Sequence, residues 1–210
     1  MIQSLSSKIL NYLIKKKAIN ETAEEKEFYQ YGIEITISSL LNILLILLIG
    51  LIIDGIIESV IFLICFIIIR QFTGGYHADS YLKCNLTFCM VFIATFLAYT
   101  MLYTRFNEYT SILISVTCLS IIAYYCPIEH KNKPIPAKRR KLHKIMSILL
   151  SLSYGIVGTT LTVLSNKYGV LILLTLLLVT VLVVAAIVKK GGERNEDEKQ
   201  NRHCDKGCRK

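Results

Sequence analysis

Long stretches without a charged residue dominate this sequence of 210 residues. Five of them hold 19 to 22 residues each, and a sixth holds 11. Because a helix needs about 20 apolar residues to cross the hydrocarbon core of a bilayer, the five long stretches predict membrane-spanning helices. They cover residues 35–53, 85–104, 109–128, 145–166 and 168–188, and the short stretch covers 59–69. This pattern excludes a soluble globular enzyme, a disordered chain and a secreted disulfide scaffold.

The lysines and arginines predict how these helices are oriented. If all six stretches cross the membrane, one side holds every Lys and Arg except Arg105 and Lys167. The positive-inside rule then predicts six crossings with both termini in the cytoplasm. Leaving out the short stretch destroys this asymmetry, so we count 55–69 as a crossing or re-entrant segment. The expected fold class is all-α, a polytopic helical bundle in the cell membrane, and the net charge of +9 needs no nucleic-acid partner.

The hydrophilic N-terminal region, residues 1–34, precedes a predicted transmembrane bundle over 35–188. Its first part has the pattern of an amphipathic helix with lysines beside the apolar face. Such a helix either lies among lipid headgroups and binds anionic lipid, or packs on the membrane domain like a soluble helix. Asn20 is expected to cap a second helix that continues into the first span. The apolar residues sharing one face are Ile2, Leu5, Ile9, Leu10, Leu13 and Ile14.

The C-terminal end separates from the predicted membrane domain, residues 1–190. Mixed charges after two adjacent glycines predict a disordered cytoplasmic tail over 191–210. His203, Cys204 and Cys208 in this tail are too few and too irregularly spaced for a structural zinc site, so a solvated tail is preferred. We expect no metal and no other cofactor.

A stripe of small residues recurs every four positions in the fifth span. Small side chains let two helices approach closely in a membrane. The stripe therefore predicts a helix–helix contact, either within the bundle or with a second copy in a homodimer. Its members are Ser147, Ser151, Gly155 and Thr159.

The loop between the second and third predicted spans, residues 70–84, combines two glycines, a histidine and a cysteine. The pair Gly74-Gly75 breaks a helix and permits a turn with positive φ. Asp79 or Ser80 then caps the third span, which places Cys84 in or near its first turn. There the helix dipole and a neighbouring lysine favour the thiolate, the nucleophilic form of cysteine.

His77 is the candidate base for this thiol. In a continuous helix the two residues would be separated by about 10.5 Å along the axis, so a hydrogen bond requires His77 to lie outside the helix. The glycines permit that geometry. On spacing alone, a solvated loop histidine and an unreactive cysteine remain an open alternative.

A second polar element follows the fourth span and reads Cys126-Pro-Ile-Glu-His-Lys-Asn-Lys-Pro-Ile-Pro136, then Lys138-Arg-Arg-Lys141. Together with the order Arg70-x4-Gly-Gly-x-His-x6-Cys84, it resembles the accessory gene regulator protein B family. These are integral-membrane cysteine endopeptidases that process quorum-sensing pro-peptides in Gram-positive bacteria. The resemblance covers essentially residues 1–190.

The resemblance implies that His77 and Cys84 are the catalytic pair. Cys84 would attack the peptide bond at the C-terminal boundary of the signal sequence, while His77 accepts its proton. A Cys or Ser side chain of the substrate would then resolve the acyl-enzyme and close a thiolactone or lactone. The implied partner is a pro-peptide with an acidic C-terminal segment.

Supporting roles fall on the residues around this pair. Arg70 is expected to bind a substrate carboxylate, to orient the loop or to act as a positive-inside anchor. Gln71 or the backbone amides near Gly74 and Gly75 are candidates to stabilise an oxyanion, and Asp79 either orients His77 or caps the helix. Candidates for docking the acidic segment are Lys131, Lys133, Lys138, Arg139, Arg140 and Lys141, while His130 and His143 are expected to be solvated.

Three other functions remain as alternatives. A small transporter or export component would be expected to carry ionisable residues at the membrane midplane, which these spans lack. A thiol oxidoreductase using Cys84 and Cys89 would lack the usual Cys-x-x-Cys spacing. The third alternative is a membrane scaffold without chemistry.

Overall fold

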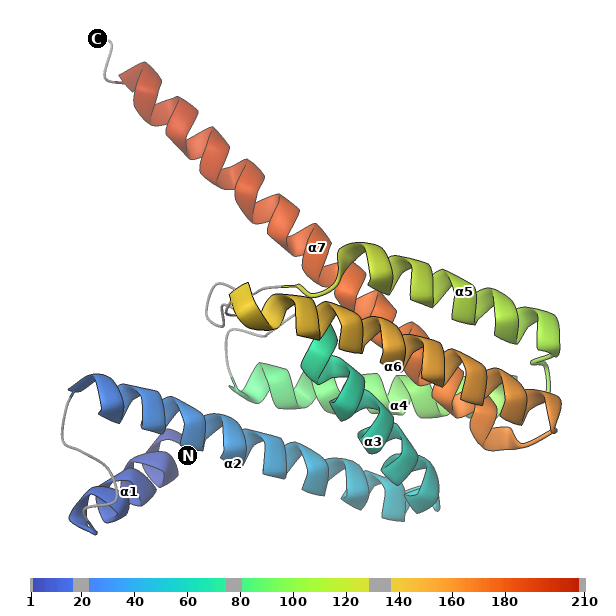
Figure 1. Cartoon of the computed structure of the whole chain (residues 1–210). Helices are drawn as coiled ribbons and strands as arrows, with labels where there is room; N and C mark the ends of the chain where they lie inside the picture. Colours follow the sequence, from blue (N-terminus) through green and yellow to red (C-terminus); the bar gives the residue numbers. More distant parts are fainter. Residues whose placement is uncertain (1, 17–22, 75–80, 129–136, 208–210) are drawn as a thin grey trace. The chain divides into compact units, whose positions relative to one another are not determined.

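The structure of the chain is a computed structural model that describes residues 2–16, 23–74, 81–128 and 137–207. The described residues form seven helices, seen in Figure 1, and one isolated backbone bridge in place of a sheet. The helices are α1 (Ile2–Lys15), α2 (Ala23–Ile52), α3 (Ile56–Thr73), α4 (Tyr81–Leu102), α5 (Glu108–Tyr125), α6 (Ala137–Val163) and α7 (Lys167–Gly207). The predicted all-α fold is confirmed.

Six of these helices are long and apolar enough to cross a membrane, as the charge distribution predicted. The short uncharged stretch forms the middle of α3, which has 18 residues. The helix is longer than the stretch because it also includes Glu58 in its first turn and Arg70 in its last turn. Ionisable residues at helix ends lie near the membrane surface and do not prevent a crossing. The candidate spans are Phe28–Ile52, Ile56–Thr73, Lys83–Leu102, Glu108–Tyr125, Arg139–Val163 and Lys167–Lys189.

The chain divides into two compact units. The first consists of Met1–Ser59 and Ala78–Phe92, and the second consists of Val60–His77 and Ile93–Lys210. The boundaries fall within α3 and α4, so each of these helices contributes residues to both units.

In the first unit, α1 packs against α2. The Ser6 hydroxyl donates to Glu34 Oε1 at 3.1 Å, and Gln30 donates to the same oxygen at 3.2 Å. Leu10 is buried, whereas Leu5 and Ile9 on the same predicted face stay exposed. The helix therefore docks on the membrane domain with part of its apolar face and leaves the rest open. The predicted continuity of α2 into the first span is confirmed, although Asn20 lies outside the described residues.

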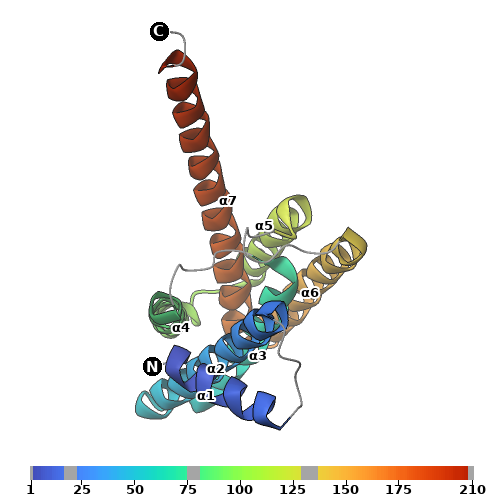
Figure 2. The ribbon, with the colours of Figure 1, turned by 90° about the vertical axis from the view of Figure 1, so that its left-hand side faces the viewer.

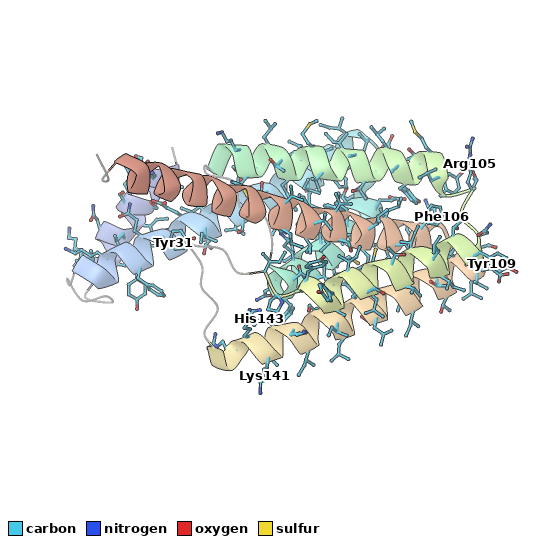
Figure 3. The ribbon with its side chains drawn as sticks, turned by 90° about the horizontal axis from the view of Figure 1, so that it is seen from above. Tyr31, Arg105, Phe106, Tyr109, Lys141 and His143 are labelled. Atoms are coloured by element: carbon cyan, nitrogen blue, oxygen red, sulfur yellow. The ribbon has the colours of Figure 1, made fainter. Side chains whose placement is uncertain are left out.

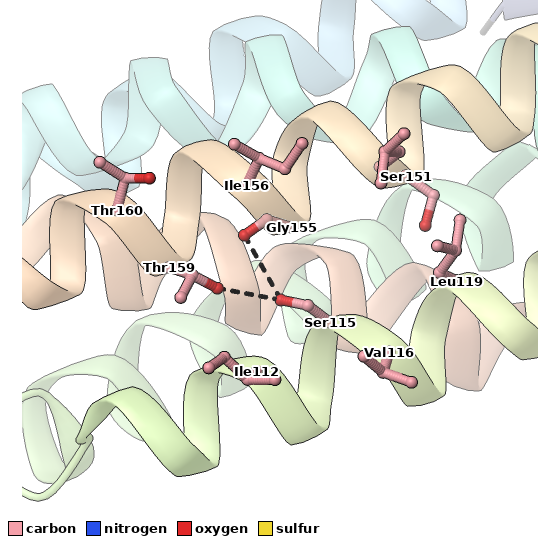
Figure 4. A pocket seen from close by; sticks show the side chains of 10 residues that line it. Ile112, Ser115, Val116, Leu119, Ser151, Gly155, Ile156, Thr159 and Thr160 are labelled. Carbon is pink, nitrogen blue, oxygen red and sulfur yellow. Dashed lines mark hydrogen bonds between the residues drawn. The ribbon is translucent and has the colours of Figure 1, made fainter.

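In the second unit, α5, α6 and α7 pack against one another through small residues. The Ser115 hydroxyl of α5 lies 3.2 Å from the Thr159 hydroxyl and 3.4 Å from the carbonyl oxygen of Gly155 on α6 (Figure 4). The small-residue stripe thus makes a contact within the bundle. A pocket of about 340 Å³ opens beside this contact, between α5 and α6.

The backbones of α6 and α7 approach each other closely at Gly169. A Cβ atom built on Gly169 would lie only 2.6 Å from the carbonyl oxygen of Gly158 and from the backbone nitrogen of Thr162. The two backbones can therefore pack at this distance only because position 169 has no side chain. Farther along α7, Val170, Leu171 and Leu174 form a buried cluster with Tyr99 of α4.

The two ends of this unit differ in composition. Figure 3 shows Arg105 and Tyr109 near one end of the α5–α6 hairpin, and Lys141 and His143 near the other. Asn107 caps α5 by accepting a hydrogen bond from the backbone N–H of Thr110 at 2.9 Å. The exposed basic residues that begin α6 therefore lie at the opposite end from this cap.

The last helix includes most of the predicted tail, residues 191–210. In the structure α7 continues through both glycines to Gly207 and extends well past α5 and α6 (Figures 1 and 2). The residues after the glycines are mainly Glu, Lys, Arg, Asp, Gln and Asn. Glu, Lys, Arg and Gln favour helix, and a helix that is already formed propagates without a new nucleation step.

Candidate active site

The loop that carries the predicted chemistry begins with a tight turn at the end of α3. Gly74 directly follows the last helical residue and has φ of +70°. Glycine adopts this left-handed conformation without a Cβ penalty, which is why it often ends a helix. The Arg70 guanidinium donates from Nη1 to the carbonyl oxygen of Gly74 at 2.9 Å, so Arg70 orients the start of the loop.

The two polar elements singled out in the sequence meet at this turn. The backbone N–H of Ile128 donates to the carbonyl oxygen of Thr73 at 3.0 Å. Gly74 and Ile128 form a parallel backbone bridge, and a Cβ atom on Gly74 would overlap the carbonyl oxygen of Ile128. The loop after α3 is therefore joined to the loop after α5 by backbone contacts that depend on glycine at position 74.

Cys126 is buried beside this junction. Burial raises the pKa of its thiol to about 12, and the positive charge of Arg70 acts in the opposite direction. A thiol with so high a pKa holds almost no thiolate at neutral pH. Cys126 therefore serves as a small buried side chain and is a poor nucleophile.

Cys84 occupies the first turn of α4, which begins at Tyr81. Its side chain is half-buried, while that of Lys83 is exposed. The backbone N–H groups of a first helical turn lack helical partners and carry the positive end of the dipole. The sequence predicted a thiolate here from a cap at Asp79 or Ser80; both capping candidates lie outside the described residues, and the thiolate stays a prediction.

Several predicted site residues lie outside the described residues. These are Gly75, His77, Asp79, Lys131 and Lys133, together with the side chain of Lys138. The pairing of His77 with Cys84 therefore stays a prediction. His130 and the tail residues His203, Cys204 and Cys208 lie beyond the described side chains as well.

The remaining predicted residues lie at the ends of α3 and α6. Gln71 is exposed in the last turn of α3, and Arg139, Arg140 and Lys141 are exposed near the start of α6. His143 was expected to be solvated, whereas in the structure its side chain is only partly exposed. Its ring packs 5.5 Å from the ring of Phe72, and its Nδ1 atom is buried.

One polar contact near Cys84 was not anticipated from the sequence. The Ser38 hydroxyl of α2 donates to Asn85 Oδ1 at 2.9 Å, and both residues are buried. The signal was an asparagine at the start of an apolar span, immediately after the candidate nucleophile. A polar residue buried within a membrane helix is costly and is a candidate for function.

These features define a class of protein: a multi-pass helical membrane protein with a cysteine at the start of one span and two joined polar loops. The family model for accessory gene regulator B matches residues 6–183. The chain therefore belongs to the accessory gene regulator B family, whose proteins act in quorum sensing.

Similar proteins include members from Clostridium and from Staphylococcus. A putative AgrB-like protein of Clostridium perfringens (strain SM101 / Type A) is 29% identical over 146 residues, which is 67% of this chain and 67% of that protein. The putative AgrB-like protein 2 of Clostridium perfringens (strain 13 / Type A) is 30% identical with the same coverage. Accessory gene regulator protein B of Staphylococcus aureus (strain MRSA252) is 30% identical over 83 residues, or 40% of this chain and 43% of that protein. No solved structure matches the chain.

Proposed function

We propose that this chain is a membrane cysteine endopeptidase that removes the C-terminal segment of a quorum-sensing pro-peptide. The observation that carries this proposal is the position of Cys84 in the first turn of α4. A helix N-terminus lowers the pKa of a cysteine and so increases the fraction of reactive thiolate. Family membership adds the biological context of peptide signalling.

In the proposed reaction, His77 accepts the proton of Cys84, and the thiolate attacks the carbonyl carbon of the scissile peptide bond. The new amine takes up a proton as it leaves with the C-terminal segment, and a thioester to Cys84 remains. A Cys or Ser side chain of the peptide then attacks this thioester. Ring closure releases Cys84 as a thiol and yields a thiolactone or lactone.

Water has to be kept from the thioester while the internal nucleophile attacks. A site at the boundary between a loop and a membrane span limits access of water. We place the reacting carbonyl at this boundary because α4 enters its candidate span at Lys83, next to Cys84.

We assign docking of an acidic C-terminal segment to the basic residues around α6. Arg139, Arg140 and Lys141 are exposed there and attract carboxylates. Arg70 is a weaker candidate for this role, because its guanidinium already donates to Gly74. Its proposed role is to hold the loop in position for the substrate.

The location and partners belong to the same proposal. Both termini lie in the cytoplasm of a Gram-positive cell, and the exposed apolar residues of α1 contact anionic lipid together with the nearby lysines. A homodimer remains part of the proposal, with the pocket between α5 and α6 as its candidate surface. The small-residue stripe itself already packs on α5.

The test is co-expression of the chain with a short candidate pro-peptide that is tagged at the C-terminus. Mass spectrometry of the tagged fragment compares wild type with His77→Ala, Cys84→Ala and Cys89→Ala. We expect release to disappear without His77 or Cys84 and to persist without Cys89, a second half-buried cysteine on the same helix. Equal release by all four proteins would contradict the proposal, and a requirement for Cys89 alone would favour redox chemistry.

A further inference from the structure

A buried polar pair joins α2 to the residue that follows the candidate nucleophile. Ser38 of α2 and Asn85 of α4 are each less than a tenth exposed, and the Ser38 hydroxyl donates to Asn85 Oδ1 at 2.9 Å. This bond orients the carboxamide with its oxygen toward α2. Asn85 is the next residue after Cys84, so Asn85 belongs to the same turn of α4 as the thiol.

The other half of the carboxamide, Nδ2, forms no hydrogen bond within the described part of the chain. Among the residues that the structure describes, nothing forms a hydrogen bond with Asn85 Nδ2, although this atom is buried. A buried donor without a partner costs about 1–3 kcal/mol, and water is scarce near the apolar core of a membrane. Such a group persists at a functional position when a ligand supplies the missing acceptor.

The geometry of α4 indicates what that acceptor is. Helical side chains lean toward the N-terminus, so both Cys84 and Asn85 extend toward the start of α4. Consecutive residues of a helix are separated by only about 1.5 Å of rise, so a peptide whose carbonyl group reaches the thiol from this end also comes near the carboxamide. The acceptor that such a peptide brings to this turn is the carbonyl oxygen of the bond that Cys84 attacks.

We infer that Asn85 Nδ2 donates a hydrogen bond to the carbonyl oxygen of the acyl group that reacts with Cys84, with Ser38 as the positioning residue. This inference rests on the proposed function, and it supplies the oxyanion-stabilising group that the sequence did not identify.

The donor acts in a defined step. As Cys84 Sγ forms a bond to the carbonyl carbon, the electron pair of the C=O double bond moves to oxygen and creates an oxyanion. Asn85 Nδ2 stabilises this charge until the pair returns, the C–N bond breaks and the leaving amine is protonated. The same donor serves the second step, in which the substrate nucleophile attacks the thioester and Cys84 leaves.

The experiment compares two reagents that react with the same thiol. Acylation of Cys84 by p-nitrophenyl acetate passes through an oxyanion, whereas alkylation by iodoacetamide is a direct displacement without one. The full chain is reconstituted in vesicles of phosphatidylcholine and phosphatidylglycerol, and both rates are measured on the Cys84 peptide by mass spectrometry. Thermal unfolding of each variant reports whether the fold is kept.

For Asn85→Ala we expect the acylation rate to fall by about 10²-fold, as for loss of one oxyanion-hole donor, with the alkylation rate unchanged. Asn85→Asp has the same size but no donor, and should lose at least as much. Ser38→Ala should lose part of the acylation rate, and Ser38→Thr, which keeps the hydroxyl, should restore it.

The matched control is Asn42→Ala. Asn42 lies one helical turn beyond Ser38 on α2 and also has a buried atom, Oδ1, without a hydrogen bond to any described residue, but it does not adjoin Cys84 in sequence. Both of its rates should equal those of wild type. Acylation of Asn85→Ala at the wild-type rate, or an equal fall in acylation and alkylation, overturns the inference.

Failure of the proposed function gives a different result. Release of the tagged pro-peptide segment that survives Cys84→Ala overturns the endopeptidase alone and leaves the ester result standing. A wild-type Cys84 that resists the ester while iodoacetamide alkylates it overturns both proposals.

Discussion

Gly74 and Ile128 lie in parallel backbone contact, and this contact joins two loops that are more than fifty residues apart in the sequence. Gly74 has φ of +70°, and a Cβ atom on it would overlap the Ile128 carbonyl oxygen. The first loop contains the candidate base, and the second leads to the basic residues at the start of α6. Joining them brings residues from both polar elements to one end of the second unit.

Gly74→Ala should therefore be strongly disruptive. Alanine is disfavoured at this positive φ, and its Cβ atom would overlap a backbone oxygen that cannot move without separating the two loops. Together these two effects should destabilise the fold by at least about 2 kcal/mol. We expect a lower unfolding temperature in detergent, faster proteolysis between α5 and α6, and loss of pro-peptide release.

Gly32→Ala is the matched control for this change. A Cβ atom on Gly32 meets nothing within 4 Å, and the residue lies inside α2. Alanine in a helix interior stabilises by up to about 1 kcal/mol relative to glycine, so this variant should unfold at or above the wild-type temperature. If Gly74→Ala unfolds and cleaves like Gly32→Ala, the junction does not have the importance assigned to it.

The number of spans could be predicted from the sequence because hydrophobic length and charge asymmetry are local properties. Their ends could not all be predicted from the charges. The uncharged stretch 109–128 extends past the end of α5 at Tyr125, because Pro127 disfavours helix at the residue before it. The contact of Gly74 with Ile128 depends on how distant segments pack, and a single sequence contains no direct signal for that.

The candidate site was predictable in its parts. The positive φ at Gly74 and the place of Cys84 in a first turn follow from local rules for glycine and helix caps. The ring contact of His143 with Phe72 and the bond between Ser38 and Asn85 arise from packing between helices. In the sequence alone, such residues cannot be distinguished from exposed polar residues, because their contacts depend on the position of the neighbouring helix.

Arg70→Lys tests whether geometry or charge matters at the end of α3. Lysine keeps the positive charge but loses the planar guanidinium, which donates from Nη1 to Gly74 at 2.9 Å. Loss of a charged hydrogen bond costs about 1.5–3 kcal/mol, so we expect pro-peptide release to slow by at least about tenfold.

Single-turnover release in membrane vesicles measures this effect. Arg105→Lys is the control, because Arg105 is exposed near the opposite end of the unit and should tolerate the change. Equal rates for both variants would indicate that Arg70 contributes only its charge.

The contact between α6 and α7 predicts a ranking of two glycine substitutions. At Gly169 a Cβ atom meets the backbone of α6 at 2.6 Å, whereas at Gly158 it meets mainly the side chain of Leu173 at 2.7 Å. A side chain can change rotamer, but two backbones have to move apart. Gly169→Ala should therefore destabilise more than Gly158→Ala, by about 1–3 kcal/mol.

Unfolding in mixed micelles with increasing denaturing detergent would measure both variants. Because neither glycine belongs to the candidate active site, activity per folded molecule should stay close to wild type. The reverse ranking would mean that α6 and α7 separate more easily than the close backbone approach implies.

Cys126 provides a prediction that depends on pH. Burial raises the pKa of its thiol from an ordinary value of 9.0 to about 12, against the opposing effect of Arg70. At pH 9 the folded protein should therefore hold only about one thiolate per thousand molecules at this position. Iodoacetamide should modify Cys126 far more slowly in the folded chain than in the denatured chain, as measured by mass spectrometry of its peptide.

The sign for stability follows from the same shift. The folded state binds this proton more tightly than the unfolded chain, so the contribution of Cys126 is complete below about pH 9 and falls as the pH rises toward 12. In Cys126→Ala the decline of the unfolding temperature across this alkaline range should be shallower than in wild type, whatever its value at neutral pH. An equally steep decline, or rapid alkylation of folded Cys126 at pH 9, would show that water reaches this thiol and that the junction beside Arg70 is open.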